Sequence, residues 1–226
     1  MKYSAVLTGL FSLIMLACPP VWAQTTSGNV IEFDILKDGD PMGTHIIEFD
    51  HRNNLVTSQI NIKLKIKMGF ITLYGYEHSN TEIYRGHQLV SINAKTNENG
   101  NKSEVRASLE GDAILVECPE GDYKAPRNIS AATYWHKDML FKQKALNTQS
   151  GQLEALDVVM LETGYIDVAG EKVLADHFLI RAPEDDIHIW YHNRTGEMLD
   201  LRLETQGVKI EYERTTPVSI MTASIE

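Results

Sequence analysis

Apolar and polar residues alternate in short runs along most of the chain after Gly28. The clearest run is Asn61 to Met68, where aliphatic side chains and lysines follow each other in strict alternation. Successive residues of a β-strand point to opposite faces of a sheet, so this run predicts a strand with one buried face. Its lysine face is typical of a solvated face or a protected sheet edge, and an anion-binding stripe is the alternative.

Turn residues separate these runs at the intervals of an antiparallel meander. In the first turn, Asp38 to Pro41, Gly39 supplies a positive φ and the proline fixes the backbone that follows. Similar turns are expected at residues 85–87, 97–101, 110–112, 120–122, 169–171, 193–196 and 206–207. The pattern therefore predicts antiparallel strands over most of the chain.

One segment, residues 129–144, has a helical pattern instead. Ser130 is a suitable N-cap, and Tyr134, Met139 and Leu140 can pack against a sheet. The next residues, 145–151, have the composition of a loop. We therefore predict one short helix that crosses the sheet.

The chain shows no internal repeat, low-complexity linker or shift of composition. We predict a single all-β domain over residues 24–214, followed by a flexible tail over residues 215–226. The expected architecture is a large curved antiparallel sheet or open barrel with one short helix.

The N-terminus predicts export. Lys2 precedes an apolar run from Ala5 to Cys18, and residues 21–23 have the small or apolar side chains that signal peptidase requires. We expect residues 1–23 to be a signal peptide cleaved after Ala23, and the protein to be periplasmic or secreted. Lipidation at Cys18 is the alternative. No later run is long and apolar enough to cross a bilayer, so we expect no transmembrane span after cleavage.

Charge and cysteine content narrow the possible partners. A formal net charge of −10 argues against nucleic acid, which requires a basic patch. After cleavage Cys118 is the remaining cysteine, so no disulfide can form within one mature chain. We expect Cys118 to be a small buried hydrophobic residue, because no nearby basic residue in the sequence supports a reactive thiol.

The sequence carries none of the short motifs of serine hydrolases, nucleotide-binding proteins or zinc proteases. His188 and His192 raise the question of a metal site, because they share one face of a predicted strand. They would lie about 13 Å apart along that strand, which is too far for one ion. We therefore assign no metal, no cofactor and no catalytic residue, and favour a protein that is not an enzyme.

Aromatic and polar side chains are combined in three places. Tyr76 and His78 share one face of a predicted strand and suit either an aromatic core ladder or the wall of a pocket for an amphipathic ligand. Trp135 lies in the helical segment, ahead of the polar loop that contains Asn147 and Gln149. These three residues would close a pocket or dock the helix on the sheet.

The third place is Trp190, which alternates with aliphatic residues and shares its strand face with His188 and His192. A ring of this size on a polar face implies either a helix lying over it or a ligand.

The chain resembles a bacterial family of secreted proteins known only as a domain of unknown function. The matching motifs, in order, are Gly69-Phe70, Tyr76-Glu77-His78, Thr96-Asn97-Glu98-Asn99-Gly100, Tyr134-Trp135, Leu146-Asn147-Thr148-Gln149-Ser150-Gly151 and Trp190-Tyr191. The resemblance spans nearly the whole mature chain, but His136 departs from it because the family often has Asn there. It implies an all-β fold and no established activity. At the level of the fold alone, the chain is also similar to envelope lipoprotein-carrier and polyisoprenoid-binding proteins.

Our first hypothesis is an exported protein that binds an apolar or amphipathic, lipid-like molecule on the concave face of the sheet. Aromatic contacts would come from Tyr76, Trp135 and Trp190, and polar orientation from His78, Asn147 and Gln149.

Two alternatives stay open. An envelope enzyme would use a His–carboxylate pair such as His78 and Glu77, or His136 with Asn147 and Gln149. A structural or assembly module would use the lysine face or a free sheet edge to meet a protein partner that the sequence does not identify.

Overall fold

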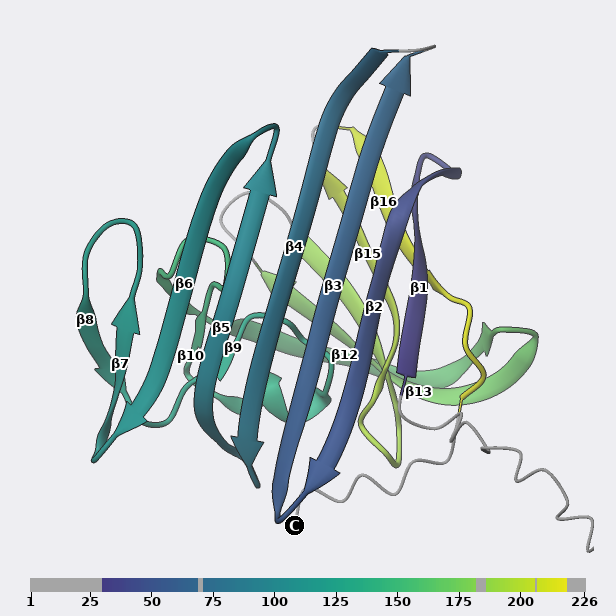
Figure 1. Ribbon diagram of the computed structural model, residues 1–226. Helices are drawn as coiled ribbons and strands as arrows, with labels where there is room; N and C mark the ends of the chain where they lie inside the picture. Colours follow the sequence, from purple (N-terminus) through teal and green to yellow (C-terminus); the bar gives the residue numbers. More distant parts are fainter. Residues whose placement is uncertain (1–29, 69–70, 182–185, 206, 219–226) are drawn as a thin grey trace, which may run out of the picture.

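One antiparallel sheet of 13 strands dominates the computed structural model, which describes residues 30–68, 71–181, 186–205 and 207–218 (Figure 1). The predicted signal peptide, with Cys18 and Ala23, lies outside the described residues. The strand order is β12-β13-β14-β15-β16-β1-β2-β3-β4-β5-β6-β7-β8. The strands that come first and last in the sequence, β1 and β16, therefore pair with each other in the middle of the sheet. The predicted all-β class and large antiparallel sheet are confirmed.

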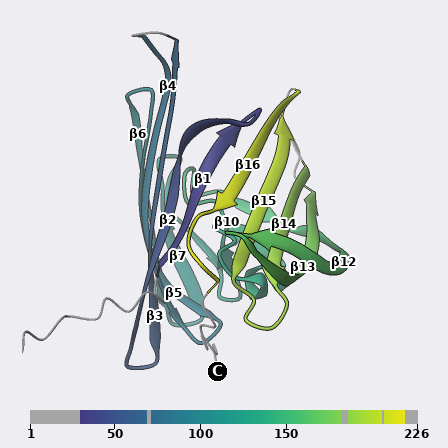
Figure 2. The same ribbon diagram turned by 90° about the vertical axis from the view of Figure 1, so that its right-hand side faces the viewer.

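The strands fall into two groups along the chain. The first group is β1 (Val30–Lys37), β2 (Asp40–Arg52), β3 (Leu55–Met68), β4 (Ile71–Arg85), β5 (Gln88–Glu98), β6 (Asn101–Glu110), β7 (Ala113–Glu117) and β8 (Tyr123–Pro126). The second group is β12 (Asp157–Val168), β13 (Glu171–Arg181), β14 (Asp186–His192), β15 (Met198–Thr205) and β16 (Val208–Arg214). Strands β2 to β6 form one wall and β13 to β16 the other, with β1 between them (Figure 2).

The strand predicted from strict alternation is part of β3, and the predicted faces are confirmed. Ile62 and Leu64 are half-buried, whereas Lys63 and Lys65 are exposed. Strands β3 and β4 extend past β5 (Figure 1): the pairing of β4 with β5 ends at Tyr76, whereas β3 and β4 stay paired beyond it.

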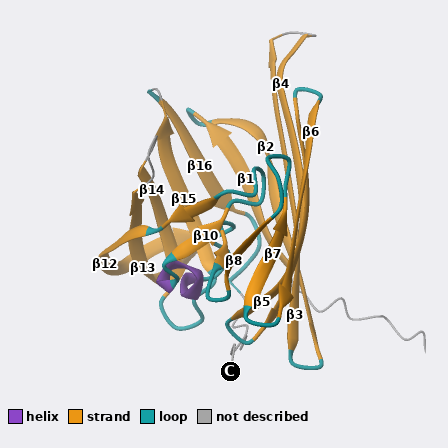
Figure 3. Cartoon of the chain, turned by 90° about the vertical axis from the view of Figure 1, so that its left-hand side faces the viewer, coloured by secondary structure: helices purple, strands orange, loops and turns teal. Residues whose placement is uncertain are grey.

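The segment between β8 and β12, residues 127–156, fills one end of the space between the walls; we call it the crossover segment. It contains a small sheet of β9 (Ser130–Ala131), β10 (Lys144–Leu146) and β11 (Leu153–Ala155), and the 3₁₀-helix η1 (Lys137–Phe141). Trp135, Met139 and Leu140 of this segment are buried in the main hydrophobic core. Helix η1 lies beside β13 (Figure 3).

The predicted helix over residues 129–144 is wrong except for its central turn. Ser130 lies in β9, which pairs with β10, and Tyr134 has a φ of 54° that no right-handed helix accommodates. Pairing with other strands has overridden the local helical pattern. His136, rather than Ser130, caps η1: its Nδ1 accepts a hydrogen bond from the backbone N–H of Asp138 at 3.2 Å. Asn is favoured at this position for the same reason.

The chain past Arg214 stays in contact with the sheet as far as it is described. The backbone N–H of Thr215 donates to the carbonyl of Glu32 at 2.9 Å, and the Arg214 guanidinium donates to the carbonyl of Pro217 at 3.1 Å. Val218 packs against a small apolar cluster on the outer face of β13 and β15.

Two smaller points complete the fold. No helix in the described parts of the chain is long and apolar enough to cross a membrane. Cys118 is half-buried and its Sγ donates to the carbonyl of Gly121 at 3.2 Å.

Candidate ligand site on the inner face of the sheet

The cross-strand register brings polar side chains together in the middle of the inner face. His45 on β2 is paired with Ile62 on β3, Ile62 with His78 on β4, and His78 with Thr96 on β5. Directly paired residues of antiparallel strands lie on the same face, and all but the half-buried Ile62 of this row are buried. A row of mixed polarity therefore crosses an otherwise apolar face.

His78 is hydrogen-bonded through both ring nitrogens. Its Nδ1 lies 2.9 Å from Oγ1 of Thr96, and its Nε2 lies 3.2 Å from Oγ1 of Thr148. The second contact fixes the loop of residues 147–150 against β4. Burial lowers the pKa of His78 to about 4, so its ring is neutral at pH 7.

His45 is buried without such partners. Its side chain is 5% exposed, and neither Nδ1 nor Nε2 has a hydrogen-bond partner among the described residues. Its ring centroid lies 6.0 Å from that of Phe33 and 5.7 Å from that of Tyr212. Burial, and to a smaller degree the neighbouring His78, lowers the pKa of His45 to about 3. Its ring is therefore also neutral.

Tyr76 and Tyr212 add two phenols from distant strands. The Tyr76 ring stacks on His78 with centroids 6.3 Å apart, and its buried hydroxyl has no partner among the described residues. Burial raises the pKa of Tyr76, and Tyr212 raises it further; burial raises the pKa of Tyr212 itself to about 12. Strands β4 and β16 are four places apart in the sheet, so their phenols interact because the sheet is strongly curved. We call His45, Tyr76, His78 and Tyr212 the neutral cluster.

Half-buried apolar side chains flank the neutral cluster toward the end of the interior opposite the crossover segment. On one wall, Leu64 is paired with Tyr76 and Ile66 with Tyr74. On the other wall, Leu203 is paired with Ile187 and with Ile210, and all three are half-buried. The inner face is thus only partly covered there.

A pocket of about 600 Å³ lies against β3, β4, β5 and β6 at the level of the neutral cluster. Most of its lining is on the outer face, where Lys63, Glu77 and Lys95 are exposed and Glu104 is paired with Lys95. This pocket therefore lies on the outer side of the strands that carry His78, and it is not part of the inner site.

Trp135 belongs to the closed end of the interior. It is 4% exposed, packs edge-on against Phe49 at 5.1 Å and Tyr84 at 5.8 Å, and its Nε1–H donates to Oε2 of Glu82 at 3.0 Å. Asn80 Nδ2 donates to the other oxygen of Glu82 at 2.7 Å. Burial raises the pKa of Glu82 to about 6 in spite of these bonds. Trp135 thus ties the crossover segment to β4.

The side chains of Asn147 and Gln149 do not contact the neutral cluster, and Asn147 instead stabilises the backbone of its own loop. Asn147 Oδ1 accepts hydrogen bonds from the N–H groups of Gln149 and Ser150, and its Nδ2 donates to Glu154 at 2.7 Å. The Gln149 side chain is exposed, whereas Thr148 between them is buried against His78. Tyr76, His78 and this loop are brought together as a group, and their role in binding stays a prediction.

Trp190 lies on the outer face of the sheet, away from this group. Ile189 and Tyr191 beside it are buried inside, as alternation predicts. The prediction that Trp190 contributes to a site on the concave face is wrong, because the ring faces outward, where its neighbours on β13 and β15 contact it. His177 stacks on it with centroids 4.0 Å apart, and the Arg202 guanidinium lies 4.9 Å from the ring centroid.

The histidines of this strand take separate roles. His188 Nδ1 lies 2.9 Å from Nε2 of His177, whereas His192 Nδ1 accepts from the backbone N–H groups of Arg194 and Thr195. In the described parts of the chain, no three His, Cys, Asp or Glu side chains form a group that could hold a metal ion.

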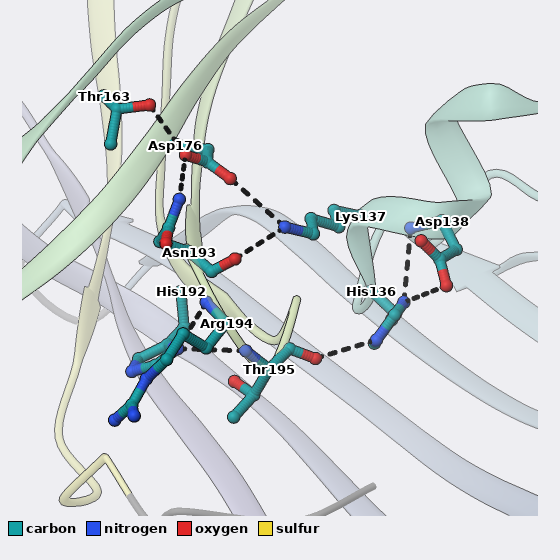
Figure 4. A network of polar contacts seen from close by, with 9 residues as sticks. All are labelled: His136, Lys137, Asp138, Thr163, Asp176, His192, Asn193, Arg194 and Thr195. Carbon is teal, nitrogen blue, oxygen red and sulfur yellow. Dashed lines mark hydrogen bonds and ion pairs between the residues drawn. The ribbon is translucent and has the colours of Figure 1, made fainter. Parts of the chain in front are cut away.

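A second polar network holds η1 to the second wall (Figure 4). The Lys137 ammonium donates to Oδ2 of Asp176 at 3.1 Å and to the carbonyl of Asn193 at 2.8 Å. Oδ1 of Asp176 accepts from Asn193 Nδ2 at 2.7 Å and from Thr163 at 2.8 Å. Although burial opposes it, the combined effect of these donors lowers the pKa of Asp176. Both carboxylate oxygens of Asp176 thus have hydrogen-bond partners within the protein, which indicates a structural role for this network.

The residue pairs predicted for the enzyme alternative do not contact each other in the structure. Glu77 is exposed on the outer face while His78 is buried on the inner face. His136 bonds to the carbonyl of Thr195 at 3.0 Å and caps η1, whereas Asn147 bonds within its own loop.

Sequence reasoning missed His45, Thr96, Thr148 and Tyr212. The alternation of β2, β5 and β16 was a signal for three of them, because each lies at an inward position of its strand. Their convergence depends on curvature and register, which no local pattern contains.

The fold and this inner site define an all-β protein with one large, curved antiparallel sheet. The model of the family described as a domain of unknown function (DUF6134) matches residues 33–215, so the chain belongs to this family. The resemblance to an uncharacterised family is thereby confirmed.

Among solved structures, the chain is similar to a β-barrel-like protein of the domain of unknown function DUF1849 from Brucella abortus. The two share 10% identity with a TM-score of 0.60, over 82% of this chain and 94% of that chain. At this identity the likeness concerns the fold alone. A search of proteins with curated functions gave no match.

Proposed function

We propose that this protein binds an apolar or amphipathic small molecule on the concave face of its sheet. The observation that carries the proposal is the unequal filling of the interior. The crossover segment packs Trp135, Met139 and Leu140 into one end, whereas Leu64, Leu203 and other inner aliphatic side chains toward the opposite end stay half-buried. Binding an apolar body there would remove this surface from water, which is favourable.

The unsatisfied polar atoms beside this surface also support the proposal. His45 and the Tyr76 hydroxyl are buried without partners, and a buried polar group without a hydrogen bond costs free energy. Structural sites of natural proteins satisfy such groups, whereas a binding site can leave them for its ligand.

The experiment is a titration with N-phenyl-1-naphthylamine, an uncharged dye whose fluorescence rises in apolar surroundings. Leu64→Asp places a charge on the inner face, whereas Lys65→Asp makes the same new side chain on the outer face of the same strand. We expect the wild-type protein and Lys65→Asp to bind the dye with similar affinity, and Leu64→Asp to bind at least tenfold more weakly. Circular dichroism confirms that each variant is folded, and Leu203→Asp repeats the test on the opposite wall.

Absence of a saturable fluorescence rise with the wild-type protein would contradict the proposal. Equal binding by the folded variants Leu64→Asp and Lys65→Asp would contradict it as well, because the dye would then lie elsewhere. Native mass spectrometry of protein purified from its own source is the complementary measurement, since a retained small molecule identifies the ligand class directly.

The assembly alternative has one observation in its favour. Strand β12 ends the large sheet, and Tyr165 and Met160 on it are 73% and 53% exposed. A free edge with apolar side chains can pair with another chain. The three acidic residues of β12, Asp157, Glu162 and Asp167, oppose pairing of two copies, so the ligand-binding proposal is preferred.

A further inference from the structure

In the neutral cluster, the buried polar atoms without a partner among the described residues all belong to uncharged groups. His45 Nδ1 and Nε2 and the Tyr76 hydroxyl are buried in side chains that are more than nine-tenths covered, and all three belong to neutral groups. A neutral imidazole has one N–H donor and one acceptor nitrogen, and a phenol both donates and accepts. These atoms therefore suit a partner that can itself donate or accept a hydrogen bond.

Among the described residues, the charge next to His45 is already paired, and the inward-facing Lys37 lies farther along β1, where it is paired with Ile210 toward the open end. Arg214 is paired with Phe33 in the register, next to His45, but its guanidinium lies 3.4 Å from Glu197 and donates to the carbonyls of Met198 and Pro217. The neighbouring carboxylate is Glu98 at the rim, which accepts from the Tyr74 hydroxyl at 3.1 Å.

The low pKa of His45 and of His78 points the same way, because burial already prevents these rings from carrying charge at pH 7. A charged ligand group placed here would lose its hydration without gaining an opposite charge, which is strongly unfavourable. An anion would also be repelled by Glu98.

We propose that the ligand carries an uncharged hydroxyl or carbonyl group, which pairs with His45 and Tyr76 while its apolar body lies along Leu64, Leu203 and Ile210. This inference rests on the proposed function and names the class of ligand: an uncharged amphiphile such as a long-chain alcohol, ester or ketone. Fatty acid anions and alkylammonium ions are excluded from the same position.

The test is a displacement series in which N-phenyl-1-naphthylamine is competed from the wild-type protein at pH 7.5. The competitors share a twelve-carbon chain and differ at one end: dodecan-1-ol, 2-dodecanone, dodecanoate and dodecylammonium. All are used below their aggregation concentrations. We expect the alcohol and the ketone to displace the dye at least tenfold more effectively than either ion.

A smaller preference, or a preference for either ion, would overturn the inference. Failure of all four competitors to displace a bound dye would overturn it too, and the proposed function would still stand. If the dye itself does not bind, the proposed function fails first, so the two failures are distinguishable.

Two substitutions locate the effect. Tyr76→Phe and His45→Phe keep an aromatic ring and remove the unpaired polar atoms, so we expect dye binding to persist and the advantage of the alcohol over the ions to fall at least threefold. Tyr165→Phe removes the hydroxyl of an exposed tyrosine and should leave the series unchanged. An unchanged series in folded Tyr76→Phe and His45→Phe would contradict the assignment of these two residues.

Discussion

His45 should make the stability of this protein depend on pH, because folding buries its ring with neither nitrogen hydrogen-bonded among the described residues. In the unfolded chain its pKa returns to the ordinary value of 6.5, whereas in the folded protein it is about 3. Between these values the unfolded state binds more protons than the folded state. Stability is therefore complete above pH 6.5 and is lost as the pH falls below it.

The size of the effect follows from the shift. At pH 5.0, about 1.5 units below the unfolded pKa, protonation of His45 stabilises the unfolded chain by about 2 kcal/mol, whereas the folded protein stays unprotonated. His78, with a folded pKa of about 4, contributes a similar loss of the same sign. We therefore expect the wild-type free energy of unfolding to be lower at pH 5.0 than at pH 7.5.

Urea unfolding of the wild-type protein and of His45→Phe at both pH values isolates the contribution of His45. The variant places another ring between Phe33 and Tyr212 and cannot be protonated. Its loss of stability between pH 7.5 and pH 5.0 should be smaller than that of the wild-type protein by about 2 kcal/mol. His51→Phe, on the exposed part of the same strand, is the control.

An equal loss in the wild-type protein and His45→Phe would refute this reasoning, because His45 would then be accessible to protons in the folded state. The comparison does not depend on the cost of fitting the larger phenyl ring, because that cost is the same at both pH values.

Two further predictions concern the contacts that hold the crossover segment. The folded pKa of Glu82 is raised from 4.5 to about 6, so its ionisation lowers stability as the pH rises through this window. Glu82→Gln can still accept a bond from Trp135 and cannot ionise, so its free energy of unfolding should change more favourably than that of the wild-type protein by about 1 kcal/mol between pH 4.5 and 6, measured by urea unfolding. Identical slopes would contradict it. Asp176→Ala leaves the partly buried Lys137 ammonium without its carboxylate and should lower the free energy of unfolding by about 2–3 kcal/mol. The control, Asp167→Ala at an exposed position of β12, should lower it by less than about 0.5 kcal/mol. Similar losses for the two variants in thermal unfolding would show that the Asp176 network does not stabilise the fold.

Local patterns were reliable where one physical rule decides the outcome. The alternation of Ile62, Lys63 and Leu64 predicted which side chains face inward, since a strand has only two faces. The same rule predicted that Tyr76 and His78 share a face, and that Ile189 and Tyr191 lie opposite Trp190.

Local patterns failed where distant strands compete for the same residues. The helical periodicity of residues 129–144 lost to strand pairing between β9 and β10, and only residues 137–141 turn as a helix. The strand pattern predicted a helix or a ligand over Trp190, whereas the side chains that contact its ring, His177 and Arg202, come from neighbouring strands.

The sequence by itself determined the all-β class, the inward and outward positions of the strands, and a membership in an uncharacterised family, because these depend on neighbours in the chain and on motif order. Tertiary structure alone decided that His45, Tyr76, His78 and Tyr212 meet. They come from β2, β4 and β16, and their rings approach one another only because the sheet pairs its first and last strands and curves between them. Register and curvature are set by the whole sheet at once, so no single segment carries the information that places the candidate site.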